Sequence, residues 1–179
     1  MDSTTYIILL ISLIAGIFLI RKLLTMFYTK KLVNEFTNHP DQFEKVLDSK
    51  PVRLLFEIFN REFMRLNYFI TYSKKGKVDE QVEKIEKMKL NKQQRFTIFQ
   101  LLLQYYISID EEKKARKLQK RYNAFIDENN LDKVLKYNMD MELKIHFEKD
   151  LTTLSYIDSH LNNCMIQKEL YGTLKKQLY

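Results

Sequence analysis

The residues best suited to metal chemistry are two side chains close to the C-terminal end. His160 and Cys164 are four residues apart, so a helix would place them one turn apart on one face. Imidazole and thiolate bind soft metals, but two ligands fall short of a site, and His146 is the only nearby candidate for a third. We therefore interpret His160 as a surface residue and Cys164 as a buried thiol, and we expect no metal and no cofactor.

Nucleotide chemistry and covalent catalysis also lack their motifs. The chain has three glycines, Gly16, Gly76 and Gly172, so no glycine-rich loop can cradle a phosphate. Acidic pairs such as Glu111 and Glu112 are typical of a helix's first turn. Because a catalytic site can assemble from distant residues, a small enzyme with a scattered site stays open as an alternative. We expect a protein that is not an enzyme.

Six basic side chains within nine residues form the strongest charge cluster after the N-terminal region. Such a cluster can bind the phosphates of nucleic acid, with an affinity that falls steeply with salt, but Asp127, Glu128 and Asp132 follow closely. We interpret the cluster as the solvated outer face of a helix. A membrane-tethered binder of nucleic acid or anionic lipid that uses residues 113–121 is the alternative function, with nucleic acid the less favoured partner. The cluster comprises Lys113, Lys114, Arg116, Lys117, Lys120 and Arg121.

The most apolar part of the chain runs from Tyr6 to Ile20 and contains no charge. A bilayer core of about 30 Å needs roughly 20 helical residues, a length that the run reaches with its flanking threonines and leucines. A cleaved secretory signal is the alternative, but no basic region precedes the run and no small-residue cleavage pattern follows it. The sequence therefore predicts a transmembrane anchor and juxtamembrane helix over residues 1–37.

The charges around this run predict its orientation. Asp2 is the only charged side chain before it, whereas four basic residues follow it. Because basic residues stay on the cytoplasmic side, we expect a single-pass protein of the cell membrane, with its N-terminus outside and a cytoplasmic domain over residues 38–179. Each cation near the surface attracts anionic head groups by about 1 kcal/mol. The residues expected at the membrane surface are Arg21, Lys22, Lys30 and Lys31.

The composition predicts an all-α fold. With three Gly and two Pro in 179 residues, the chain lacks the turn residues that a β-sandwich or barrel requires. We expect Gly76 to end one helix and Asp79, Asn91 and Asp110 to cap the starts of others, because these residue types favour those positions. The predicted helices after the anchor cover residues 40–47, 51–72, 79–88, 91–109, 110–128, 131–147, 151–161 and 166–178.

The predicted helices form pairs that repeat approximately. At an offset of 33 residues, the segment that begins at Thr71 aligns with the segment that begins at Gln104. In this alignment Val82 corresponds to Ala115, and the predicted helix breaks coincide. This period and layout resemble the tetratricopeptide repeat. Leu102, Tyr106 and Ala115 stand at that family's large and small packing positions. The resemblance covers residues 60–126 and, by layout alone, residues 131–164. It implies a transmembrane helix followed by stacked antiparallel helical hairpins in a solenoid.

The resemblance also implies a binding groove. In the predicted helix over residues 91–109, uncharged polar side chains recur at spacings of three and four, which places them on one face. In the family, this inner face binds peptides or partner proteins, although any surface helix needs a polar side. The same offset of 33 residues predicts a corresponding polar face on the preceding hairpin. The expected partner-binding residues are Asn67, Thr71, Lys74, Lys75, Thr97, Gln100, Gln104 and Ser108.

Together these features predict a membrane-anchored scaffold or adaptor. Its partners would be a protein, which the groove recruits to the cytoplasmic membrane surface, and the bilayer with its anionic head groups. No small-molecule substrate is expected.

Overall fold

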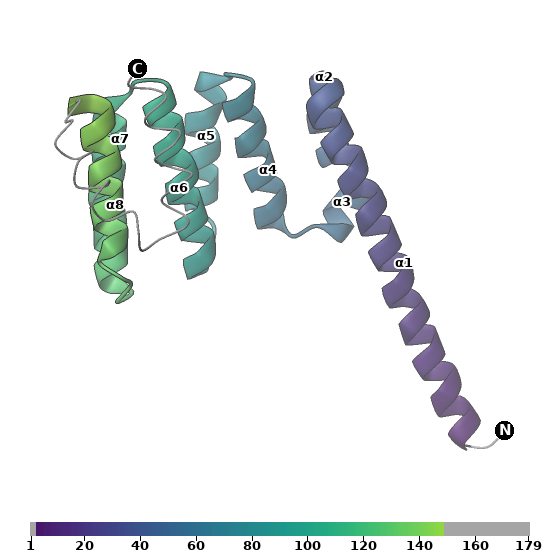
Figure 1. The fold of residues 1–179 in the computed structure, drawn as a ribbon. Coiled ribbons are helices and arrows are strands. Elements are labelled where there is room, and N and C mark those ends of the chain that lie inside the picture. The colour runs from purple at the N-terminus through teal and green to yellow at the C-terminus, as the bar shows by residue number, and fades with distance from the viewer. Residues whose placement is uncertain (1–2, 149–179) are drawn as a thin grey trace, which may run out of the picture. The chain divides into compact units, whose positions relative to one another are not determined.

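The computed structural model describes residues 3–148 (Figure 1). Within this range the chain forms eight α-helices and one π-helical turn, and no strand, which confirms the all-α class. The chain divides into two compact units, residues 1–91 and 92–179. The predicted helices over residues 151–161 and 166–178, with His160 and Cys164, lie outside the described residues.

The first helix, α1, extends without interruption from Ser3 to Asn38. Residues Tyr6–Asn38 are long and apolar enough to cross a membrane, and the apolar window within them is not buried. Membrane spans share this property with signal sequences. The predicted end of the helix before Pro40 is confirmed, because α1 ends at Asn38 and α2 begins at Pro40, where proline suits a helix's first turn.

The predicted continuous helix over residues 51–72 is wrong. Phe56 (φ −112°, ψ 136°) and Glu57 (φ −58°, ψ 152°) have extended backbone, so the segment divides into two helices. Neither residue is a helix breaker by type. The bend is a case of tertiary packing overriding local propensity, because Phe56 lines an apolar pocket together with side chains of α1 and α2. The remaining helices of the first unit are α2 (Pro40–Leu47), α3 (Lys50–Leu55), α4 (Ile58–Thr71) and α5 (Lys75–Glu86).

The turn between α4 and α5 is built on Ser73, not on Gly76. Ser73 has a φ of 54°, its N–H donates to the Ile70 carbonyl at 3.2 Å, and the Lys74 N–H donates to the Phe69 carbonyl at 2.9 Å. This pair of bonds is a Schellman motif. Gly76 lies in the first turn of α5, whose N-cap is Lys74. The prediction that Gly76 ends a helix and that Asp79 caps the next is therefore wrong.

In the first unit, α4 and α5 pack together as the first hairpin. The second unit contains the second hairpin, formed by α6 and α7. Asp110 (φ 56°) and Asn130 (φ 49°) end α6 and α7 with the same pair of bonds as Ser73. Asp110 therefore ends α6, and the prediction that it caps the next helix is wrong, whereas the predicted end of the following helix at residue 128 is confirmed. The buried side chains of α7 form one apolar stripe: Ala115, Leu118, Tyr122, Phe125 and Ile126. The elements of this unit are α6 (Lys92–Ser108), α7 (Glu112–Glu128), α8 (Val134–Leu143) and the π-helical turn Lys144–Glu148.

The two hairpins correspond at an offset of 37 residues. The left-handed residues Ser73 and Asp110 are 37 positions apart, so the predicted coincidence of the helix breaks at 33 is wrong. The two offsets differ by four residues, about one helical turn, and an apolar stripe looks much the same after such a shift. The buried residues that correspond are Leu66 with Leu103, Phe69 with Tyr106, Val78 with Ala115, and Ile85 with Tyr122.

Candidate functional site

An aromatic junction joins the C-terminal end of α1 to α2 and α4. The Phe36 ring lies 5.3 Å from that of Phe43 and 5.7 Å from that of Tyr72, and the Phe43 and Tyr68 rings stack at 4.9 Å. The Tyr68 hydroxyl donates to the Pro40 carbonyl at 2.8 Å, and the Tyr72 hydroxyl donates to the Phe36 carbonyl. Buried hydroxyls and edge-to-face rings fix such a contact geometrically. The end of α1 is therefore held directly against the first hairpin.

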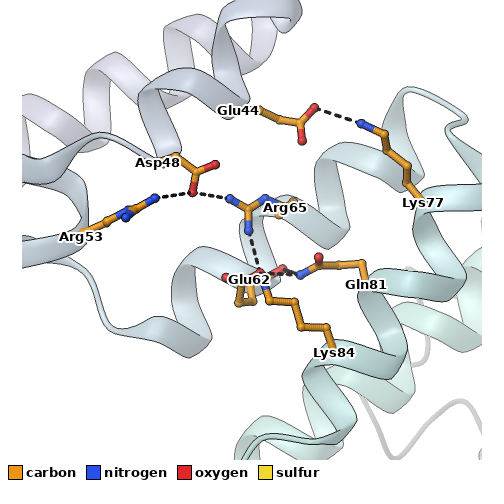
Figure 2. A network of polar contacts seen from close by, with 8 residues as sticks. All are labelled: Glu44, Asp48, Arg53, Glu62, Arg65, Lys77, Gln81 and Lys84. Carbon is orange, nitrogen blue, oxygen red and sulfur yellow. Dashed lines mark hydrogen bonds and ion pairs between the residues drawn. The ribbon is translucent and has the colours of Figure 1, made fainter.

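A buried polar network links α2, α4 and α5 (Figure 2). The Arg65 guanidinium donates to Glu62 Oε2 and to Asp48 Oδ1, both at 2.7 Å. The Gln81 amide donates to the Glu62 carboxylate and to the Glu62 backbone carbonyl, both at 2.9 Å, and Lys84 Nζ lies 2.8 Å from the same carboxylate. Glu62 and Gln81 are each 5% exposed. One carboxylate thus accepts bonds from two helices.

The network keeps its members charged. Burial alone would raise the pKa of the Glu62 carboxyl, but the bonds from Lys84, Gln81 and Arg65 lower it below its ordinary value. Burial alone would lower the pKa of Arg65, but Glu62 and Asp48 raise it. These residues were not among the predicted site residues. The usable signal was Glu62 and Arg65, an ion pair at a spacing of three inside a strongly apolar helix.

An apolar pocket of about 260 Å³ lies between α1, α2, α4 and the link that precedes α4. Its lining surface is almost entirely apolar, and the pocket is open to the outside because Val33, one of its walls, is 61% exposed. Large apolar pockets with few polar groups are the usual form of ligand sites. The lining residues are Thr29, Leu32, Val33, Phe36, Phe43, Phe56, Phe63, Met64 and Asn67.

The predicted partner-binding residues of the first hairpin do not share one helix. Asn67 lines the apolar pocket, and its side-chain amide donates to the Phe63 carbonyl at 2.9 Å. Thr71 is the exposed last residue of α4. Lys74 lies beyond the Schellman turn, where its ammonium donates to the Tyr68 hydroxyl at 2.7 Å, and Lys75 is the exposed first residue of α5.

The predicted residues of the second hairpin all lie on α6. Gln100, Gln104 and Ser108 are exposed and Thr97 is half-buried. The Thr97 hydroxyl donates to the Gln93 carbonyl at 3.0 Å and that of Ser108 to the Tyr105 carbonyl at 2.8 Å, so these hydroxyls bond to their own helix. The two glutamines are the longest polar groups of the face. This half of the predicted groove belongs to the second compact unit.

The basic residues divide into two surfaces. The residues predicted to lie at the membrane surface, Arg21, Lys22, Lys30 and Lys31, are all exposed on α1. On α7, an open hollow of about 450 Å³ is lined by Lys113, Lys117, Lys120, Arg116 and Glu112.

The α7 surface is partly neutralised. Arg116 is paired with Glu112 and Glu148, and the Lys114 ammonium lies 5.7 Å from the centre of the Tyr106 ring. Lys113, Lys117 and Lys120 are exposed and supply most of the positive charge of the hollow.

Within residues 3–148, no three His, Cys, Asp or Glu side chains are grouped so that they could hold a metal ion. The His146 imidazole lies 3.8 Å from the Asp110 carboxylate and is half-buried. Comparison with known proteins finds no matching protein family, no matching curated protein and no matching solved structure.

Proposed function

We propose that this chain is a membrane-anchored scaffold that recruits a partner protein to the cytoplasmic membrane surface. The observation that carries the proposal is the continuity of α1, which runs from an unburied apolar stretch into the aromatic junction without a break. A helix crossing a bilayer in this way would hold the first hairpin at a fixed height above the membrane. The charge distribution around α1 supports the proposed orientation.

The proposed recruiting surface is the exposed face of α6 that contains Gln100, Gln104 and Ser108. Tetratricopeptide-like stacking of the hairpins is part of the proposal, and it is supported by the shared Schellman turn and the shared buried positions of the two hairpins. Anchoring raises the effective concentration of any bound partner at the membrane, so modest affinity suffices.

The test is crosslinking of the full-length protein in native membranes, followed by identification of the captured proteins. The variant carries Gln100→Arg and Gln104→Arg. The control carries Gln42→Arg and Ala124→Arg, which add the same charge at exposed positions on α2 and α7. We expect wild type and control to capture the same few proteins and the variant to lose them, with unchanged circular dichroism. Equal capture by the variant would contradict the proposal.

A second candidate, a membrane-tethered binder of anionic lipid or nucleic acid, is favoured by one observation: the exposed lysines around the hollow on α7. Neutralised phosphates release counterions, so binding of this kind weakens steeply as salt rises. A steep salt dependence of RNA, DNA or anionic vesicle binding, lost in Lys113→Ala, Lys117→Ala, Lys120→Ala, would favour it over the scaffold.

A further inference from the structure

The apolar pocket beside α1 offers an occupant almost no hydrogen-bonding groups. Its two polar side chains already bond to their own helices: the Thr29 hydroxyl donates to the Thr25 carbonyl at 2.8 Å, and the Asn67 amide donates to the Phe63 carbonyl at 2.9 Å. A peptide placed there would leave its backbone N–H and C=O groups unpaired, which is costly. A hydrocarbon chain has no such requirement. The chemistry of the walls therefore fits an acyl chain.

The pocket is continuous with the candidate membrane span along one face of α1. The walls contributed by α1 include Thr29, Val33 and Phe36. Residues three, four and seven positions apart share a helical face, so the same face continues toward the N-terminus through Met26, which is 50% exposed, to the exposed Lys22. This face leads from the pocket to a cation at the predicted end of the span, and its one polar side chain before Lys22, that of Thr29, already bonds to its own helix.

Residues that flank Phe56 in sequence are also apolar and exposed. On either side of the bend that contains Phe56, Leu54 is 82% exposed and Ile58 is 61% exposed. Figure 1 shows α3 and its link to α4 beside the middle part of α1, whereas α2 lies at the C-terminal end of α1. Exposed apolar side chains beside the middle part of α1 suit contact with the interfacial region of a bilayer that α1 crosses.

We propose that this pocket binds one acyl chain of a bilayer phospholipid whose anionic head group stays at the membrane surface near Lys22, so that this chain extends out of the bilayer core along α1. The inference rests on the proposed membrane anchoring and extends it: the protein holds a lipid as well as spanning the bilayer. The acyl chain enters along the face of α1 that contains Met26, fills the space between Val33, Phe63 and Met64, and covers apolar surface that is otherwise exposed to water.

The experiment uses full-length protein in vesicles of phosphatidylcholine and phosphatidylglycerol that contain a phosphatidylglycerol with a photoactivatable group on one acyl chain. Labelled residues are mapped by mass spectrometry, with the label on residues 6–24 as the internal reference. The variant is Val33→Trp, whose indole fills the pocket from an exposed position. The matched control is Val134→Trp on α8, where the valine is likewise exposed, at 52% against 61% for Val33.

We expect label on residues 56–67 in wild type and in Val134→Trp, and about tenfold less in Val33→Trp, the loss expected when about two methylene groups are excluded from the pocket. Label confined to the span, or label on residues 56–67 that Val33→Trp leaves unchanged, would overturn the inference. Crosslinks from the pocket to another protein segment, or labelling only by a soluble fatty-acid probe, would overturn it as well.

Carbonate extraction of the same vesicles separates this inference from the anchoring proposal. Protein that resists extraction but carries no label in the pocket refutes only the lipid site. Protein that carbonate releases refutes the anchor and the lipid site together.

Discussion

The two helical hairpins share their turn and their buried apolar positions, yet their cores differ in polarity. At the offset of 37 residues, three buried or partly buried apolar side chains of the second hairpin correspond to three buried polar side chains of the first. The corresponding residues are Phe99 with Glu62, Leu102 with Arg65, and Leu118 with Gln81. The second hairpin thus places apolar side chains at the positions where the first hairpin buries polar ones.

The difference indicates what the polar network is for. In the first hairpin, Arg65 reaches beyond the hairpin to Asp48 at the end of α2, and Arg53 of α3 approaches the same carboxylate at 3.8 Å. Buried ion pairs add little net stability relative to apolar residues, but breaking one leaves an uncompensated charge. The network therefore directs α2 and α3 to one position on the hairpin. The second hairpin instead packs Phe99 against Tyr122 and Phe125, with ring centroids 5.6 and 5.5 Å apart.

The largest expected effect comes from removing one partner of the network. Arg65→Ala leaves the buried Glu62 carboxylate with Gln81 and Lys84 alone and should lower the free energy of unfolding by about 3–5 kcal/mol. Urea titration of the detergent-solubilised protein, followed by circular dichroism, measures it. The control is Arg53→Ala, whose side chain is 58% exposed and which should change stability by about 0.5 kcal/mol or less. Equal effects of the two variants would show that the network does not organise the core.

The free energy of unfolding should fall at high pH because of Tyr122 in the second hairpin. Burial raises the pKa of the Tyr122 phenol to about 12 from its ordinary value of 10.0. Because the folded state holds the proton more tightly, this contribution to stability is complete below pH 10 and is lost as the pH rises through 12. Over the whole titration, which begins below pH 10 and ends above pH 12, wild type should lose about 3 kcal/mol more than Tyr122→Phe.

Urea titrations at three pH values in that range provide the measurement, with Tyr137→Phe, at an exposed position, as the control. If Tyr122→Phe loses as much stability as wild type, folding does not raise the pKa of the Tyr122 phenol.

A smaller effect is expected when the core of the second hairpin is transferred to the first. The combination Glu62→Phe, Arg65→Leu and Gln81→Leu removes all the buried polar groups at once, so the free energy of unfolding should rise by about 2 kcal/mol. The folded-state pKa of Glu62 is lowered, so its contribution is present above about pH 4.5 and is lost at lower pH. The variant should therefore also lose less stability in acid than wild type. A destabilised variant would mean that the network, not apolar packing, closes this hairpin.

The fold class and most helix boundaries could be predicted because they depend on local signals. Proline at position 40 begins α2 at the predicted residue, and the stripe through Leu118 and Tyr122 follows the helical period. The bend at Phe56 could not be predicted, since it depends on a pocket formed by helices distant in sequence. The offset of 37 was missed because a shift of one helical turn preserves an apolar stripe.

The candidate site was predicted less well than the fold. The exposure of Gln100 and Gln104 follows from their spacing, but Asn67, expected on the same kind of polar face, lines the apolar pocket. Glu62 and Arg65 were not predicted as site residues, because their burial depends on partners contributed by α2 and α5. Only the tertiary structure brings these partners together.

The unbroken course of α1 has a mechanical consequence. Its 36 residues measure about 54 Å at 1.5 Å per residue, and a bilayer core occupies about 30 Å of that length. Helices adapt to a thinner or thicker bilayer chiefly by changing their tilt, and α1 contains no hinge between its apolar stretch and the aromatic junction. In a bilayer the helix is therefore a lever arm, and the orientation of the first hairpin over the surface varies with the thickness of the membrane around it.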